Sequence, residues 1–152
     1  MSRVSVDFKI DTSRIVNEVN SVIDDRYVRA AIHKLLAEMC DKYVPYDTGY
    51  LSEDSVYYTQ DGVHYSAEYA HYVYEGLVYG PNIPYIDKNG EQKWASPKGK
   101  PKFPTGREMS YQMINHPEAT GHWDQVMLQN EGDIFRERVH EIIQRRLKKL
   151  NG

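Results

Sequence analysis

The sequence predicts an α+β fold with N-terminal helices, a small antiparallel sheet built from β-hairpins and a long C-terminal helix. Apolar residues recur every three or four positions in several stretches, which is typical of helices packed on a core. Asp61-Gly62 and Asn89-Gly90 each lie between β-prone runs, a strong hairpin signal. The 152 residues, 40% apolar and 27% charged, suit one globular domain spanning residues 1–152.

The N-terminal third of the chain predicts an extended arm followed by two helices. Apolar and polar residues alternate over an arm at about residues 1–11, as they do in a strand. The polar residues 11–13 favour a helix start, so a first helix is expected from about residue 12, with a break near Asp24-Asp25. The broadest apolar stripe runs from residue 27 to residue 43 and predicts a second helix, which Pro45 ends.

The middle of the chain predicts hairpins and one short helix. Residues 55–66 are rich in β-branched and aromatic side chains around Asp61-Gly62, which indicates a hairpin. A short helix is expected over residues 69–75, ended by Gly76 in a left-handed conformation. Prolines and glycines crowd residues 79–106, which predicts a projecting loop or hairpin.

The last helix is expected to open at Thr120 or Gly121 and to carry an apolar stripe to the end of the chain. Gly132 marks a break within it, where Asp133 could form a new cap. The basic residues 145–149 suit a helix C-terminus, where the macrodipole favours cations. This explanation is preferred to a DNA-binding tail.

Composition excludes several classes of function. The formal net charge of −3 gives no global reason to expect avid nucleic-acid binding. No apolar run is long enough to span a bilayer, the N-terminus lacks a secretory core, and no membrane partner is expected. The single cysteine, Cys40, excludes an intramolecular disulfide and is expected to be buried. Thirteen tyrosines favour an interaction protein, because tyrosine combines apolar area with a polar tip.

No catalytic, cofactor-binding or metal-binding residues are predicted. The spacings of His64 with His71 and of His116 with His122 do not match a helical zinc site. The sequence contains no nucleophile elbow, phosphate loop or dinucleotide fingerprint, so neither a cofactor nor a small-molecule substrate is expected. A metal-dependent nuclease or other small hydrolase using His64, His71 or His116 with nearby acids remains an alternative.

Residues 45–55, here called the corner, form the stretch around which the chain is organised. Pro45 lacks a backbone donor and disfavours helix before it, while Asp47, Thr48 and Gly49 favour turns. Leu51 is expected to fill part of the core. The corner is therefore predicted to be structural, with a docking role.

The corner and the motifs that follow it resemble a known family. A helix ending in Val-Pro-x-Asp-Thr-Gly-x-Leu, a β-hairpin, and then Tyr-Ala-x-Tyr-Val-x-Glu-Gly is similar to the minor capsid and head-tail joining proteins of tailed bacteriophages and prophages, especially those of Gram-positive bacteria. The Ala-Thr-Gly-His-Trp run at residues 119–123 is also similar, and the resemblance covers about residues 28–145. The chain departs from the family at Ser52, where relatives often carry a basic residue, and at Leu77.

The resemblance implies a non-enzymatic structural protein of the virion neck, with a minor capsid or tail-completion role. Its implied partners are other copies of itself in a ring, neighbouring connector and tail proteins, and genome DNA in passive contact. It would be made in the host cytoplasm. A small bacterial adaptor is a further alternative. The residues expected to form the corner and subunit contacts are Pro45, Asp47, Thr48, Gly49, Leu51, Ser55, Tyr69, Ala70, Tyr72, Val73, Glu75, Gly76 and Trp123.

Overall fold

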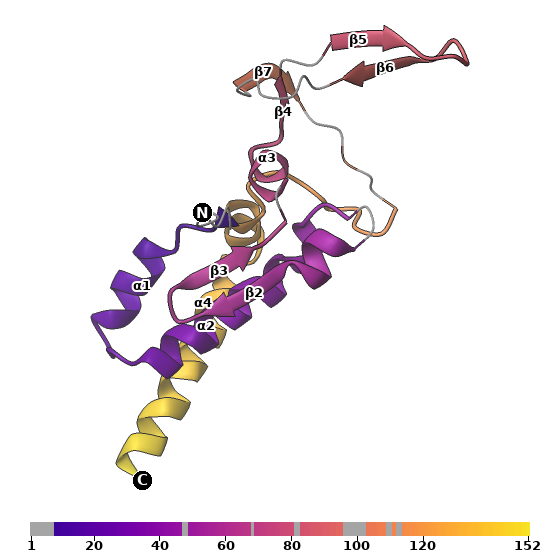
Figure 1. Cartoon of the computed structure of the whole chain (residues 1–152). Coiled ribbons are helices and arrows are strands. Elements are labelled where there is room, and N and C mark those ends of the chain that lie inside the picture. Colours follow the sequence, from indigo (N-terminus) through magenta and orange to yellow (C-terminus); the bar gives the residue numbers. More distant parts are fainter. Residues whose placement is uncertain are drawn as a thin grey trace, which may run out of the picture.

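The fold is α+β, as the sequence predicts (Figure 1). The structure, a computed structural model, describes residues 8–46, 49–67, 69–80, 83–95, 103–108, 111 and 114–152. Helices and a three-stranded sheet form a packed body, and two narrow β-ribbons extend from it at the top of Figure 1. No helix in the described part of the chain combines the length and apolarity that crossing a membrane requires.

Two helices precede the corner. Helix α1 spans Ser13–Asn20 and α2 spans Arg26–Cys40, followed by a 3₁₀ turn, η1, at Asp41–Tyr43. Asp25 caps α2, because its carboxylate accepts the backbone N–H groups of Tyr27 and Val28. The predicted break near Asp24-Asp25 is therefore confirmed.

The start of α1 differs in detail from the expectation of a polar cap. The side chain of Thr12 makes no capping bond, and Asp11 accepts the Ser13 N–H at 3.0 Å instead. The buried Thr12 hydroxyl lies 2.8 Å from Nε2 of His33. His33 Nδ1 donates to the Thr59 carbonyl, so Nε2 of the neutral ring accepts from Thr12. Burial lowers the pKa of His33, which favours this neutral form.

The small sheet has the order β1-β3-β2 and is antiparallel. Strands β2, Val56–Thr59, and β3, Gly62–Tyr65, form the predicted hairpin. Thr59 pairs with Gly62, so the turn centres on Gln60 and Asp61, one residue earlier than an Asp-Gly turn would. Gly62 instead makes room for Lys9, whose Cε would lie 3.0 Å from an added Cβ.

The N-terminal arm contributes one edge of this sheet. Strand β1, Phe8–Lys9, pairs with Tyr65 and His64 of β3. The backbone N–H of Ile10 then donates to the Val63 carbonyl. The rest of the expected arm, residues 1–7, lies outside the described residues.

The two ribbons follow the short helix α3, Ala70–Glu75. Strand β4, Leu77–Gly80, pairs with β7, Phe103–Glu108, and β5, Ile83–Ile86, pairs with β6, Gln92–Ala95. The β5–β6 hairpin lies around Asn89-Gly90, where a hairpin was expected, whereas β4–β7 was not predicted.

The loop at the tip has five residues, 87–91, one more than the expected loop of residues 88–91 built on Asn-Gly. The carboxylate of Asp87 accepts the backbone N–H groups of Asn89 and Glu91, and Gly90 has a φ of 78°. These backbone bonds, and then Lys93, lower the pKa of Asp87.

Helix α4, Trp123–Asn151, runs antiparallel to α2 through the body (Figure 1). It begins two to three residues later than predicted, because His122 takes a left-handed conformation before the first turn. The predicted break is present one residue before Gly132, where Glu131 has a non-helical φ of −131°.

The core lies between α2, α4 and the three-stranded sheet. Cys40 is fully buried there, as predicted, and burial raises the pKa of its thiol far above its usual range. The other fully buried apolar side chains include Ile10, Val28, Leu36, Val44, Val63, Tyr65, Ala70, Trp123 and Met127.

Candidate functional site

The second half of the corner is a wide helical turn. Tyr50–Asp54 form one π-helical turn, η2, opened by the bond from the Glu53 N–H to the Gly49 carbonyl. Leu51 is buried in the core, as expected, and Pro45 is half-buried. Asp47 and Thr48 lie outside the described residues.

Gly49 is constrained by its backbone conformation and by the side chains around it. Its φ of 87° is in the left-handed region, as its predicted turn role requires. An added Cβ would lie 2.8 Å from the Tyr46 hydroxyl oxygen and 3.1 Å from a Glu53 carboxylate oxygen. The left-handed backbone therefore favours glycine, and an added side chain would also force Tyr46 and Glu53 to shift.

Ser55 ties the corner to the hairpin. Its buried hydroxyl donates to the Leu51 carbonyl at 2.8 Å. Its own carbonyl accepts both the backbone N–H and the hydroxyl of Ser66, at 3.0 and 3.1 Å. The corner and β3 are thus held together by backbone and side-chain hydrogen bonds at once.

The predicted residues on and around the short helix α3 differ in how deeply they are buried. Ala70 is buried, Tyr72, Val73 and Glu75 are half-buried, and Tyr69 is exposed at the helix start. Gly76 ends the helix with a φ of 71°, and its N–H reaches the Tyr72 and Val73 carbonyls. This left-handed C-terminus confirms the expectation for Gly76.

Trp123 lies in a cluster that we call the aromatic joint, made of Phe8, Tyr65, Tyr74 and Trp123. The Trp123 ring meets Tyr65 at 5.2 Å and Tyr74 at 4.9 Å, both edge to face, and Phe8 lies 4.7 Å from Tyr74. The Trp123 indole N–H also donates to the Tyr65 hydroxyl at 3.1 Å. The joint links β1, β3, α3 and α4.

Tyr74 and Asp124 were not predicted as site residues. The Tyr74 hydroxyl donates to a buried carboxylate oxygen of Asp124 at 2.5 Å, across 50 positions of sequence. Burial, and then the Asp124 carboxylate, raise the pKa of Tyr74 far above its usual range, so the hydroxyl stays protonated. The sequence signal that could have found this pair is the helical spacing of Tyr74 from Ala70, since both face inward.

Residues 116–122, here called the bridging segment, connect the residues just before the corner to α3. The Thr120 N–H donates to the Tyr43 carbonyl at 2.9 Å, and the His122 N–H donates to the Tyr74 carbonyl at 2.8 Å. His116 donates through Nδ1 to the Val44 carbonyl at 2.7 Å. The two motifs, separated in sequence, therefore meet on one segment in space.

Gly121 permits the close approach of the bridging segment to α3. A Cβ at this position would lie 2.7 Å from the Tyr74 carbonyl oxygen. No left-handed φ is involved, so packing alone excludes a side chain here.

Tyr43 and Lys42 fasten the base of the corner to the kink of α4. The Tyr43 hydroxyl and the Lys42 ammonium reach one Glu131 carboxylate oxygen at 2.6 and 2.9 Å. Hydrogen bonds from Tyr43 and then Lys42 lower the pKa of Glu131. The kink thus places the Glu131 carboxylate against the residues just before the corner.

The histidines are spread over several contacts. Glu75 lies 3.6 Å from ring nitrogens of both His71 and His122. His64 stacks on Tyr57 with ring centroids 4.7 Å apart. Among the residues that the structure describes, no group of three His, Cys, Asp or Glu side chains is placed to hold a metal ion.

The site is therefore a rigid joint in which the predicted motifs converge on the start of α4. Searches of protein-family models, curated proteins and solved structures found no match to this chain.

Proposed function

We propose that this protein is a structural component of the head-tail junction of a tailed phage or prophage, with a minor capsid or tail-completion role. It joins the two halves of the particle as a ring of identical subunits. The observation that carries the proposal is the order of three sequence pieces: the corner, the Tyr-Ala-x-Tyr-Val-x-Glu-Gly helix and the Ala-Thr-Gly-His-Trp helix opening.

The arrangement of these pieces supports a mechanical role. Described residues of all three pieces pack near the bridging segment and the aromatic joint, so the motifs contribute to the shape of the body. Tyr69, Tyr57 and Tyr58 remain exposed around the same body and offer amphipathic surface to neighbours. Such a joint would transmit force between partner proteins and would not catalyse a reaction.

An early stop codon in the gene tests the proposal. Lysates of a phage carrying the stop should contain DNA-filled heads and finished tails that are not joined, seen by negative-stain electron microscopy. Complementation with the intact gene from a plasmid should restore joined particles. Joined, infectious particles in the uncomplemented mutant would contradict the proposal.

A further inference from the structure

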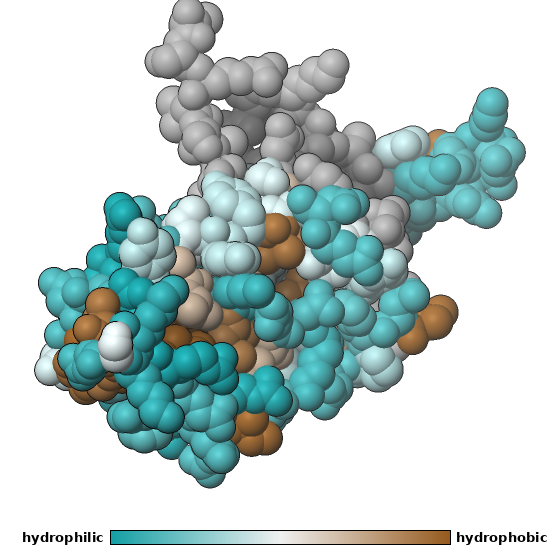
Figure 2. All heavy atoms as spheres, turned by 90° about the horizontal axis from the view of Figure 1, so that it is seen from below, coloured by the Kyte–Doolittle hydropathy of each residue, from teal (hydrophilic) through white to brown (hydrophobic). Residues whose placement is uncertain are grey.

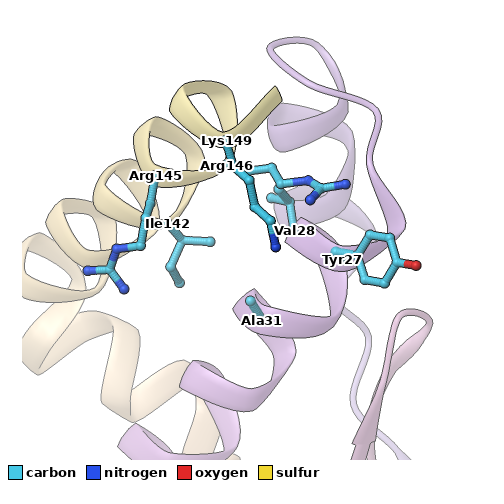
Figure 3. A pocket seen from close by; sticks show the side chains of 7 residues that line it. All are labelled: Tyr27, Val28, Ala31, Ile142, Arg145, Arg146 and Lys149. Atoms are coloured by element: carbon cyan, nitrogen blue, oxygen red, sulfur yellow. The ribbon is translucent and has the colours of Figure 1, made fainter. Parts of the chain in front are cut away.

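Charge is segregated along the α2–α4 pair. The end where α2 begins and α4 finishes carries a basic groove of about 690 Å³ (Figure 3). The opposite end of α2 carries an acidic hollow of about 360 Å³ beside strand β2. Seen from below, the molecule presents a mainly hydrophilic surface with separate apolar patches (Figure 2).

The basic groove has an apolar floor and a cationic rim. Val28, Ala31 and Ile142 form the floor, and Arg145 and Lys149 stand on the rim (Figure 3). No ion pair or hydrogen bond joins either cation to another of the described residues.

The remaining rim residues hold the groove in shape. Arg146 is occupied within the subunit, since its Nε lies 2.9 Å from the Asp25 carboxylate. Its guanidinium also lies 4.9 Å from the ring centroid of Tyr27, which is 58% exposed. Arg145 and Lys149 are therefore the cations left to meet an incoming acid.

The acidic hollow has complementary features. Glu38 and Asp41 line it with Tyr57 and Tyr58, and one cation, Lys34, is also present. Tyr58 is 45% exposed. Burial raises the pKa of Asp41, and His116, whose Nε2 lies 4.0 Å from the Asp41 carboxylate, opposes this shift.

The hollow also contains an unsatisfied polar group. Ser52 lines it and is 5% exposed, and its hydroxyl has no hydrogen-bond partner among the described residues. A buried hydroxyl without a partner costs free energy. A cationic side chain entering the hollow would meet Glu38 and Asp41.

We propose that the basic groove of one subunit docks against the face that surrounds the acidic hollow on the next copy of the same chain. The exposed ring of Tyr58 then covers the apolar floor, while Arg145 and Lys149 approach Glu38 and Asp41. The two surfaces lie roughly 20 Å apart along one rigid helix, at about 1.5 Å per residue, so they cannot meet within a subunit. Two different surfaces of this kind make a head-to-tail contact, the type that closes a ring.

This inference deepens the proposed function, because it assigns the two faces of the ring contact. A charge swap tests it. One variant combines Arg145→Glu with Lys149→Glu, and the other combines Glu38→Lys with Asp41→Lys, the two carboxylates of the hollow. Sedimentation velocity at low ionic strength measures self-association of each protein and of the equimolar mixture.

The wild-type chain should self-associate, and the dissociation constant of each variant alone should rise by at least about tenfold. The mixture should recover association to within about threefold of wild type, as a one-to-one pair. Lys88→Glu with Glu91→Lys at the hairpin tip is the matched control and should leave association unchanged. Thermal unfolding of every variant verifies that the chain still folds.

Three results would overturn the proposed contact: a monomeric wild-type chain, variants that associate like wild type, or a mixture that does not recover. These results are distinguishable from failure of the proposed function. Unjoined heads and tails in the stop-codon lysate would leave the neck role standing even if the contact between copies were wrong.

Discussion

The packed body and the projecting hairpin use the same residue types under very different constraints. Gly49 in the corner and Gly90 at the hairpin tip have φ angles of 87° and 78°. A Cβ at Gly49 would collide with Tyr46, whereas nothing lies within 4 Å of a Cβ at Gly90. A turn glycine in the sequence therefore indicates backbone shape, and only its tertiary surroundings decide how much the fold depends on it.

Aromatic and apolar side chains show the same contrast. Trp123 is 0% exposed in the aromatic joint, while Ile86 of strand β5 is 66% exposed. The β5–β6 ribbon has only two strands, which are marginally stable alone in water. Global stability should therefore depend on the body and depend little on the hairpin.

The largest expected effect is at the centre of the joint. Trp123→Ala should lower the free energy of unfolding by about 3–5 kcal/mol, because it leaves a cavity among packed rings. Ile86→Ala in the hairpin should change it by less than about 0.5 kcal/mol. Urea denaturation followed by far-ultraviolet circular dichroism measures both, and equal effects would show that the hairpin belongs to the folding core.

The two glycines allow the sharpest matched pair. Gly49→Val should cost about 2–4 kcal/mol, since left-handed strain adds to a steric clash. Gly90→Val should destabilise only the hairpin tip, so the unfolding midpoint of the body should stay unchanged. The Gly49 variant should also fail to support plaque formation, while normal plaque numbers would argue against a role for the corner in assembly.

Removal of one hydroxyl tests the buried bond between α3 and α4. Tyr74→Phe should cost about 1–3 kcal/mol, because the buried Asp124 carboxylate loses its donor. Tyr85→Phe, at an exposed position of β5, should be neutral in the same denaturation assay. A neutral Tyr74→Phe would mean that Asp124 is satisfied without Tyr74.

The smallest effect concerns two carboxylates with lowered pKa values. The hydrogen bond from Arg146 is the largest cause at Asp25, and backbone bonds to the tip loop are the largest at Asp87. A lowered folded-state pKa means that each group stabilises its own element above the unfolded pKa near 3.8 and that this contribution is lost as pH falls through the folded value.

Asp25→Asn should therefore reduce body stability at neutral pH, and the difference from wild type should shrink below about pH 4. Asparagine still caps a helix, so the variant isolates the ion pair with Arg146. Asp87→Asn should leave the same unfolding curves unchanged at every pH. A difference between wild type and Asp25→Asn that persists at acid pH would indicate a cap defect instead of a lost charge pair.

Local chemistry explains which features were predictable. The stripe of α2, the left-handed Gly76 and the Asp25 cap depend on residues within a few positions of each other. Bonds between Tyr74 and Asp124 and between Tyr43 and Glu131 join residues 50 and 88 positions apart, so no short pattern encodes them. Strand β7 includes Pro104 and a bulged register against β4, which removes the alternation that identifies a strand.

The candidate site divides in the same way. The corner and the short helix were visible as motifs, whereas their meeting on the bridging segment depends on Gly121 and on backbone bonds from Thr120 and His122. The turn of the first hairpin is centred on Gln60 and Asp61, and Lys9 of the neighbouring strand β1 occupies the space beside Gly62, a contact between distant residues that no turn motif encodes.

The most direct test of the neck role locates the protein in assembled particles. Antibodies raised against the purified chain, labelled with gold, would be applied to tail-less heads and to complete virions and imaged by electron microscopy. The neck role predicts gold at the junction of head and tail and none along the capsid or the tail tube. Gold at another place, or particles that contain none of this protein, would contradict it.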